Sequence, residues 1–413
     1  MSIQTTCDEL LPRLYHSEYA KITAVLCRRF GLRQIETAQD IASETFLKAA
    51  ETWPEKGIPE NPAAWLYTVA DNKAKDYFRH TNIFEKKIKH QVVENHPETE
   101  PDIDFTEQSM ADSQLAMMFA ICDPAITKEA QICLALQVLC GFSIEEISDA
   151  LLSKKEAIKK RLLRAKSRLR NSNFRITKLT QNAMTQRMET VLTVLYLLFN
   201  EGYHSQSAKS HIRRELCLEA ISLTLMLVDT PLTNTPQANA LLSLMCFQSS
   251  RFDARTNVFG ESILFQEQDK NLWDKTLIER GNYYLVEACS NETISKYHLE
   301  AGIAYWHTVS SDERKWKHIL KLYNQLLLIE YSPTVALNRT FAFAKVYGNK
   351  EALTEAKKLS LDSWSYYHAL LGFLYADFAP EKALIHYDTA LSLSKSQAEK
   401  KTISSWIKQL SIK

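Results

Sequence analysis

The sequence predicts an all-α protein with several helical domains, and three observations lead to this prediction. The chain has 413 residues, which is too long for one typical domain. It contains only nine glycines and few clear runs of alternating β-branched residues. Apolar residues recur instead at the 3.6-residue spacing of amphipathic helices. We therefore expect helices packed on helices along most of the chain.

The first helical domain is expected over residues 8–85, and its first informative helix covers AQDIASETFLKA, residues 38–49. Helical periodicity places Asp40, Ser43, Glu44 and Leu47 on one face, with Ile41, Thr45 and Ala49 on a neighbouring face. A mixed acidic and apolar surface suits a protein partner, although it is also compatible with an ordinary solvated helix face.

The next helix is predicted to start after Asn61-Pro62, because Asn can cap a helix and Pro fits its first turn. Its apolar positions, which mainly predict core packing, are Trp65, Leu66, Val69, Ala70, Ala74 and Tyr77. Its other side carries hydrogen-bonding and cationic groups, as a surface that reads an unpaired strand requires. These residues are Thr68, Asn72, Lys73, Asp76 and Arg79.

Residues 86–112 are polar and acid-rich and are interpreted as a linker, followed by a second domain over residues 113–173. Within it, FSIEEISDALLSKKEAIKKRLLRAKSRLR, residues 142–170, predicts a helix-turn-helix. Apolar stripes are formed by Ile144, Ile147 and Leu151 in the first helix and by Ile158, Leu162, Ala165 and Leu169 in the second.

The second helix of this pair is predicted to present a basic outer face. Residues 154–175 contain ten Lys or Arg and one acid. Such a helix fits the major groove of DNA, although a charged helix can equally be a solvated face. The outward residues are Lys155, Glu156, Lys159, Lys160, Leu163 and Arg164. Ser153, at the junction between the helices, is expected to cap the second one.

The order of AQDIASETF, NPAAWLYTVADNKAKDY and RLLRAKSRLR resembles bacterial sigma factors of the extracytoplasmic-function group. The resemblance implies that Asp40, Ser43, Glu44 and Leu47 bind core RNA polymerase as region 2.2. It implies that region 2.4 contacts the minus 10 element of promoter DNA through Trp65, Thr68, Asn72, Lys73, Asp76 and Arg79. It also implies that region 4 contacts the minus 35 element through Lys155, Glu156, Lys159, Lys160, Leu163 and Arg164.

A C-terminal helical extension is expected over residues 185–413. Its segments VLYLLFNEGY, RELCLEA, QEQDKNLW and SPTVALNR resemble the sigma-factor subfamily whose extension is similar to tetratricopeptide repeats. The expected architecture is therefore an all-α chain of region 2, linker, region 4 helix-turn-helix and a solenoid-like extension that regulates activity. Its last repeat is the clearest, through Leu371, Gly372, Tyr375, Ala383, Tyr387 and Ala390.

The role of this extension is open at the level of sequence. It is either an interaction module for a regulator or a sensor that binds a small ligand in the helical bundle. A different interpretation of the whole chain is a polymerase-independent DNA-binding regulator with a helical ligand- or partner-sensing domain. Region 2.2 discriminates between them, because only a sigma factor must hold core polymerase there.

Other functional classes lack support in the sequence. No GxxxxGK[ST], GxSxG or HExxH motif occurs, so no enzyme and no cofactor is predicted. The eight cysteines form no CxxC pair, and Glu201-x-x-His204 has no second copy with which to build a dinuclear metal site. With no signal-like segment and no run of eighteen apolar residues, a cytoplasmic protein without a membrane partner is expected.

Overall fold

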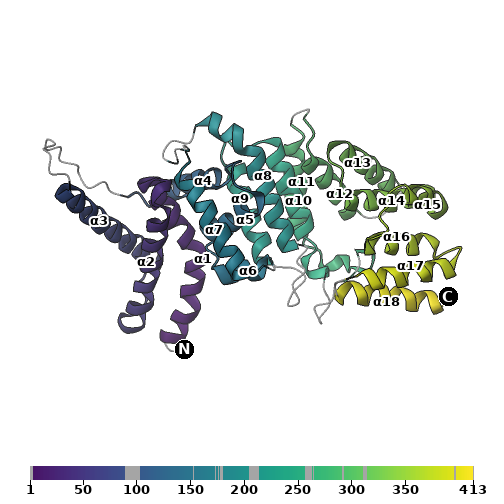
Figure 1. Cartoon of the computed structure of the whole chain (residues 1–413), viewed down its shortest axis with the longest axis horizontal. Helices are drawn as coiled ribbons and strands as arrows, with labels where there is room; N and C mark the ends of the chain where they lie inside the picture. Colours follow the sequence, from purple (N-terminus) through teal and green to yellow (C-terminus); the bar gives the residue numbers. More distant parts are fainter. Residues whose placement is uncertain are drawn as a thin grey trace. The chain divides into compact units, whose positions relative to one another are not determined.

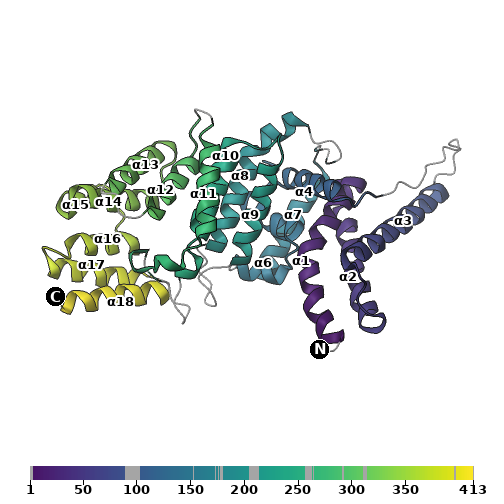
Figure 2. The same ribbon diagram turned by 180° about the vertical axis from the view of Figure 1, so that it is seen from behind.

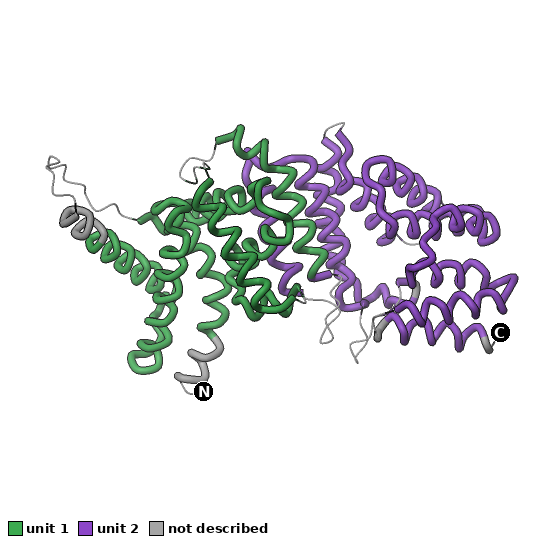
Figure 3. Tube along the Cα trace, viewed as in Figure 1, with its two compact units in different colours: residues 1–201 green, residues 202–413 purple. Residues whose placement is uncertain are grey.

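The computed structural model describes the backbone of residues 3–88, 103–151, 153–172, 174, 176, 180–203, 214–255, 263, 265–290, 293–309, 314–394 and 397–412. Every secondary-structure element in this part of the chain is helical, which confirms the all-α prediction. The chain divides into two compact units, Met1–Glu201 and Gly202–Lys413, which Figure 3 colours separately.

The first unit begins with three long helices, α1 (Ile3–Phe30), α2 (Ile35–Lys56) and α3 (Pro62–Ile88). Asn61 precedes α3, and its side-chain oxygen accepts a hydrogen bond of 3.1 Å from the backbone N–H of Ala64. The predicted start of this helix is therefore confirmed. α1 and α2 pack against each other through fully buried side chains that include Ile22, Leu26 and Phe46.

The second half of this unit comprises α4 (Glu107–Ile121), α5 (Lys128–Leu134), α6 (Ile144–Ala150), α7 (Lys155–Arg170) and α8 (Gln181–Tyr203). A π-helical turn, η2 (Ala135–Leu139), follows α5. The Thr106 side chain caps α4, so the chain is helical from Glu107 although the predicted linker extends to residue 112. Residues 89–102 of that linker lie outside the described part.

Helix α8 is attached to the first unit by Arg187. Its guanidinium pairs with the Asp123 carboxylate at 2.8 Å and donates to the backbone carbonyls of Phe119 and Ala120 at 3.0 and 3.2 Å. Both charged side chains are less than one-fifth exposed, so this contact is well shielded from water. The boundary between the two units lies within the last turn of α8, between Glu201 and Gly202, whereas the sequence places the start of the extension at residue 185.

The second unit opens with α9 (Arg214–Asp229), α10 (Pro236–Ser249) and α11 (Lys275–Ala288). Short 3₁₀ turns connect α10 to α11, at Phe252–Ala254, Phe265–Glu267 and Lys270–Leu272. α10 packs against α9, α11 and the following helix, and nearly all its side chains are buried. It is the central element of this half of the unit because apolar residues occupy all its sides.

The remaining helices of the second unit form a series in which each packs against the next (Figures 1 and 2). They are α12 (Lys296–Thr308), α13 (Lys315–Ile329), α14 (Pro333–Tyr347), α15 (Asn349–Lys357), α16 (Ser365–Tyr375), α17 (Pro380–Leu393) and α18 (Gln397–Ile412). A helical extension is thus confirmed. Three local clusters of buried side chains follow one another along this series rather than one common core.

Gly372 lets α16 and α17 approach closely. A Cβ atom at this position would meet two Tyr387 ring carbons at 2.5 Å, and Tyr387 is itself only 5% exposed. We expect Gly372→Ala to lower the free energy of unfolding by about 1–3 kcal/mol through overpacking, measured by urea denaturation. Gly302→Ala is the matched control, because its Cβ would meet only the end of the Leu322 side chain, at a less severe 3.2 Å. Equal stability of the two variants would contradict this packing model.

Glu219 on α9 is a largely buried carboxylate whose pKa burial raises from 4.5 to about 7. Below pH 4.5 the group is protonated in both the folded and the unfolded state. As the pH rises toward 7 the unfolded state releases the proton first, so stability falls and the loss levels off above pH 7. We expect Glu219→Gln to raise the free energy of unfolding by about 1–3 kcal/mol at pH 8.

The same substitution should leave stability nearly unchanged at pH 4. Denaturant unfolding of both proteins at several pH values checks this difference. Glu215→Gln is the matched control, since Glu215 is an exposed carboxylate on the same helix. A stabilisation by Glu219→Gln that does not depend on pH would count against a buried, titrating carboxyl.

Candidate polymerase and nucleic-acid interface

Helix α2 exposes the face that the sequence assigns to a protein partner. Its buried side contains Ile41, Thr45 and Ala49, so these three residues belong to the core and not to the partner surface. Helical periodicity separates the two sides. The exposed face is mainly acidic and polar, with the Leu47 side chain 59% exposed, and it consists of Asp40, Ser43, Glu44 and Leu47.

This face adjoins α3 through an ion pair between helices. The Lys73 ammonium lies 2.7 Å from a Glu44 carboxylate oxygen, with the two side chains 31% and 59% exposed. A pair this accessible contributes less than about 1 kcal/mol, so it can exchange for other partners at little cost. The candidate polymerase-binding and minus 10 surfaces are therefore neighbours in the fold.

The predicted strand-reading residues of α3 form one exposed row. Thr68, Asn72, Asp76 and Arg79 follow each other at spacings of four, four and three residues, and all four are exposed. An Arg79 guanidinium nitrogen lies 3.2 Å from Asp76 Oδ1. This contact partly offsets the negative charge of Asp76 within a surface expected to meet phosphates.

Trp65 has a different environment from the other predicted minus 10 residues. It is half-buried, and its ring contacts the fully buried Trp53 edge to face, with centroids 5.5 Å apart. An aromatic pair of this kind contributes about 0.5–1.5 kcal/mol beyond the area it buries. The structure thus places Trp65 in the packing between α2 and α3, whereas Thr68, Asn72, Asp76 and Arg79 form the exposed row on α3.

Helices α6 and α7 occupy the positions predicted for the helix-turn-helix. α6 begins with a capping box in which Ser143 Oγ accepts from the Glu146 backbone N–H and Glu146 accepts from the Ser143 backbone N–H. The predicted apolar stripe of α7 is buried, and it consists of Ile158, Leu162, Ala165 and Leu169. In α6, Ile147 is fully buried, and Ile144 and Leu151 are half-buried.

The outer face of α7 is exposed as predicted. Lys155 pairs with Glu145 at 3.0 Å and Lys159 with Glu156 at 3.1 Å, and all four side chains are more than half exposed. Such pairs are weak and leave the ammonium groups accessible to phosphate. The six predicted residues that are exposed here are Lys155, Glu156, Lys159, Lys160, Leu163 and Arg164.

Two details of α7 differ from the sequence interpretation. Ser153 does not cap the helix, because Lys154 is its N-cap residue and the Ser153 hydroxyl donates to the Leu151 carbonyl at 3.1 Å. The hydroxyl stabilises the turn instead. Sequence reasoning also missed Arg168, which is exposed four residues beyond Arg164 and extends the cationic face. Its i+4 spacing was the available signal.

The C-terminal half of α7 contacts the start of α2. The Lys166 ammonium donates to Gln39 Oε1, and an Arg170 guanidinium nitrogen lies 2.9 Å from Glu36 Oε1. Burial lowers the pKa of Lys166. These contacts join segments more than a hundred residues apart, and they place the helix-turn-helix against the first three helices within one compact unit.

No cluster of three metal-ligating side chains occurs among the described residues, which do not include His204. No described helix is long and apolar enough to cross a membrane. Six of the seven described cysteines are buried as thiols, and only Cys289 is exposed.

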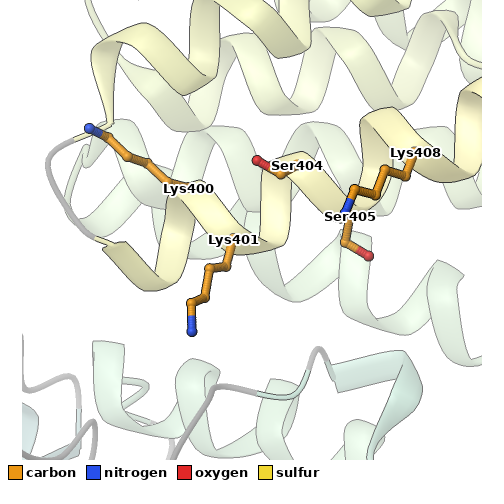
Figure 4. Close-up of a pocket in the computed structure, with 5 residues that line it drawn as sticks. All are labelled: Lys400, Lys401, Ser404, Ser405 and Lys408. Carbon is orange, nitrogen blue, oxygen red and sulfur yellow. The ribbon is translucent and has the colours of Figure 1, made fainter.

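A pocket of about 420 Å³ lies on α18, and all of its described lining residues belong to that one helix. Figure 4 shows the Lys400 and Lys401 side chains pointing in different directions, so their charges do not converge on one ligand position. The lining residues are Lys400, Lys401, Ser404, Ser405 and Lys408.

Comparisons with known proteins agree with the N-terminal interpretation. Residues 14–82 match the family model for sigma-70 region 2, and residues 187–289 match a family of unknown function, DUF6596. An uncharacterized protein of Rhizobium meliloti (strain 1021) is 29% identical over 384 residues, covering 89% of this chain and 88% of the relative. No solved structure matches the chain significantly.

The site lies in a segment that is similar to one class of domain, because residues 14–82 match the model for sigma-70 region 2. The exposed α2 face and the α3 row both lie within the matched residues. This domain supports a sigma-factor role in which the partners are RNA polymerase and promoter DNA. The match to region 2 ends before α6 and α7, and the DUF6596 match begins within α8.

Proposed function

We propose that this protein is a sigma factor of the extracytoplasmic-function group that binds core RNA polymerase and directs initiation at specific promoters. It works where the polymerase is, in the cytoplasm. The observation that supports this most directly is the exposed polar and acidic face of α2 inside the matched region 2 domain. The sigma factor performs no covalent chemistry, because the polymerase transfers the nucleotide.

In this proposal the two DNA surfaces have separate roles. The α3 row captures the opened minus 10 strand, with Lys73 and Arg79 near phosphates and Thr68, Asn72 and Asp76 near bases. Helix α7 docks on the minus 35 element through its six outward residues and Arg168. The second unit is a tetratricopeptide-like extension that regulates these activities, as its series of consecutively packed helices suggests.

Run-off transcription with core polymerase tests the proposal, using the full chain and a version ending at Glu201. This end point retains α8 and its Arg187–Asp123 contact, which an end near residue 173 would remove. We expect the full chain to form holoenzyme and initiate at promoters selected from a random library. Comparison with the shorter version shows whether the extension restrains or enables initiation. Sequence-specific DNA binding without polymerase binding would instead indicate a polymerase-independent regulator.

A further inference from the structure

Two arginines of the second unit surround the end of α8. Arg251 donates from Nη2 to the Tyr203 hydroxyl at 2.7 Å. Arg255 donates from Nη1 to the Tyr203 backbone carbonyl at 2.9 Å, and its guanidinium carbon lies 3.8 Å from the centroid of the Tyr203 ring. Both guanidinium groups are therefore held in place by a single, almost fully buried tyrosine.

An aromatic side chain, Phe265, lies next to Arg251 and contacts two further rings. The guanidinium carbon of Arg251 lies 5.1 Å from the centroid of the Phe265 ring, and that ring is 4.7 Å from His307 and 5.9 Å from Trp273. Three separate segments, before α9, between α10 and α11, and in α12, thus meet here. We call the group the arginine–aromatic cluster, and it consists of Tyr203, Arg251, Arg255, Phe265, Trp273 and His307.

The two arginines give the cluster positive charge. Among the described residues, neither arginine forms an ion pair with a carboxylate, whereas Arg187 pairs with Asp123 and Arg339 with Glu355. The Lys315 ammonium donates to the backbone carbonyls of His307 and Val309.

Burial and neighbouring cations both lower the pKa of basic groups at this place. Burial lowers the pKa of Arg255, and Arg251 lowers it further while Tyr203 opposes the change. The pKa of Lys315 is likewise lowered by burial and then by Lys270. Buried charges are normally paired. The described protein groups supply no counter-charge to these cations, so an anionic ligand would complete the pairing.

Unsatisfied polar atoms gather at the same place. Trp273 is 5% exposed, and within the described part of the chain neither its Nε1–H nor the buried Nδ1 of His307 has a hydrogen-bond partner. The pKa of His307 is lowered to about 3 by burial and by Arg251 and Lys315, so the ring is neutral at pH 7. A buried polar group without a hydrogen bond is destabilising, and a hydrogen-bonding ligand removes that cost.

We propose that the arginine–aromatic cluster is a binding site for a small aromatic carboxylate. The guanidinium groups, which Tyr203 holds in place, supply the planar donors that match a carboxylate, and the partly exposed ring of Phe265 supplies a flat apolar face for an aromatic ring. Trp273 Nε1–H and His307 Nδ1 add hydrogen bonds that fix the orientation. The site makes the second unit a sensor, and the inference stands independently of the sigma-factor assignment.

Calorimetric titration of the full chain without polymerase tests the site, with benzoate, phenylacetate and indole-3-acetate as probes and their neutral amides as controls. We expect saturable binding of at least one acid, at least tenfold tighter than its amide, and a higher melting temperature in its presence. Absence of binding by all three acids, or equal binding of acid and amide, would overturn the proposal. Because polymerase is absent, this failure is distinct from a failure of the sigma-factor proposal.

Substitutions locate the bound acid. Arg251→Gln should weaken binding at least tenfold, and Arg251→Lys should retain part of it because the charge remains. If Arg251→Gln fails to fold, Trp273→Phe serves instead, since it removes the indole N–H and keeps a smaller aromatic ring at this position; we expect a three- to tenfold loss. The matched control is Arg280→Gln, an exposed arginine on α11. Undiminished affinity in the folded cluster variants would place the acid elsewhere.

Discussion

Reversing the charge of the α2 face is expected to weaken holoenzyme formation at least tenfold. In Asp40→Arg combined with Leu47→Arg, two cations replace an acidic and an apolar group on a surface that is exposed in the free protein. Like charges placed across an interface repel, and truncating a central apolar contact removes part of the binding energy. We expect the affinity for core polymerase to fall at least tenfold, or about 1.4 kcal/mol, in a fluorescence binding assay.

Two controls separate this loss from misfolding. Both residues are exposed, so the melting temperature of the double variant should stay close to that of the parent chain. Glu60→Arg makes a similar charge change at an exposed residue in the turn before α3, outside the α2 face. Core polymerase binding that survives in the double variant would show that the α2 face is not the contact.

Removing cations from α7 is expected to weaken use of the minus 35 element. Lys159 and Arg164 are both exposed, and Lys159 makes only a weak pair with Glu156. Each lost phosphate contact should reduce the slope of log K against log salt by about 0.9. For Lys159→Ala with Arg164→Ala we therefore expect a slope smaller by about two and at least tenfold weaker binding. Holoenzyme binding to promoter DNA across a salt series measures both quantities.

The promoter itself supplies the sharpest control for this prediction. On a promoter whose minus 35 sequence has been scrambled, the reduction in salt slope should remain, because phosphate contacts do not depend on sequence, and the loss of affinity should be smaller than on the intact promoter. Lys128→Ala removes an exposed cation from α5, outside the α7 face, and should leave both slope and affinity unchanged. If the double variant loses the same affinity on intact and scrambled promoters, Lys159 and Arg164 do not read the bases of the minus 35 element.

The sequence predicted those features that depend on local periodicity. The stripe of Ile158, Leu162, Ala165 and Leu169 is buried and the charged residues between them are exposed, because a helix of sixteen residues sorts its faces by the 3.6-residue repeat alone. The start of α3 at Pro62 follows from Asn61 in the same way, since a cap involves residues only three apart.

The environments of two side chains could not be predicted from helical periodicity. Trp65 shares its helix with the exposed row, yet its side chain is half-buried against Trp53 because α2 crosses α3 at that level. Ser153 was expected to accept a capping hydrogen bond, but its hydroxyl donates to the Leu151 carbonyl in the same turn. For Trp65 a neighbouring helix selects the outcome, and for Ser153 the conformation of the turn does.

By itself, the sequence determined the all-α class, the exposed faces of α2, α3 and α7, and the resemblance to region 2 that the family comparison supports. Only the tertiary structure decided that Lys166 meets Gln39 across 127 residues and that Arg251 and Arg255 converge on Tyr203. The physical reason is that helix formation and facing are local, whereas these contacts depend on which distant helices pack together, and no spacing within one segment encodes that choice.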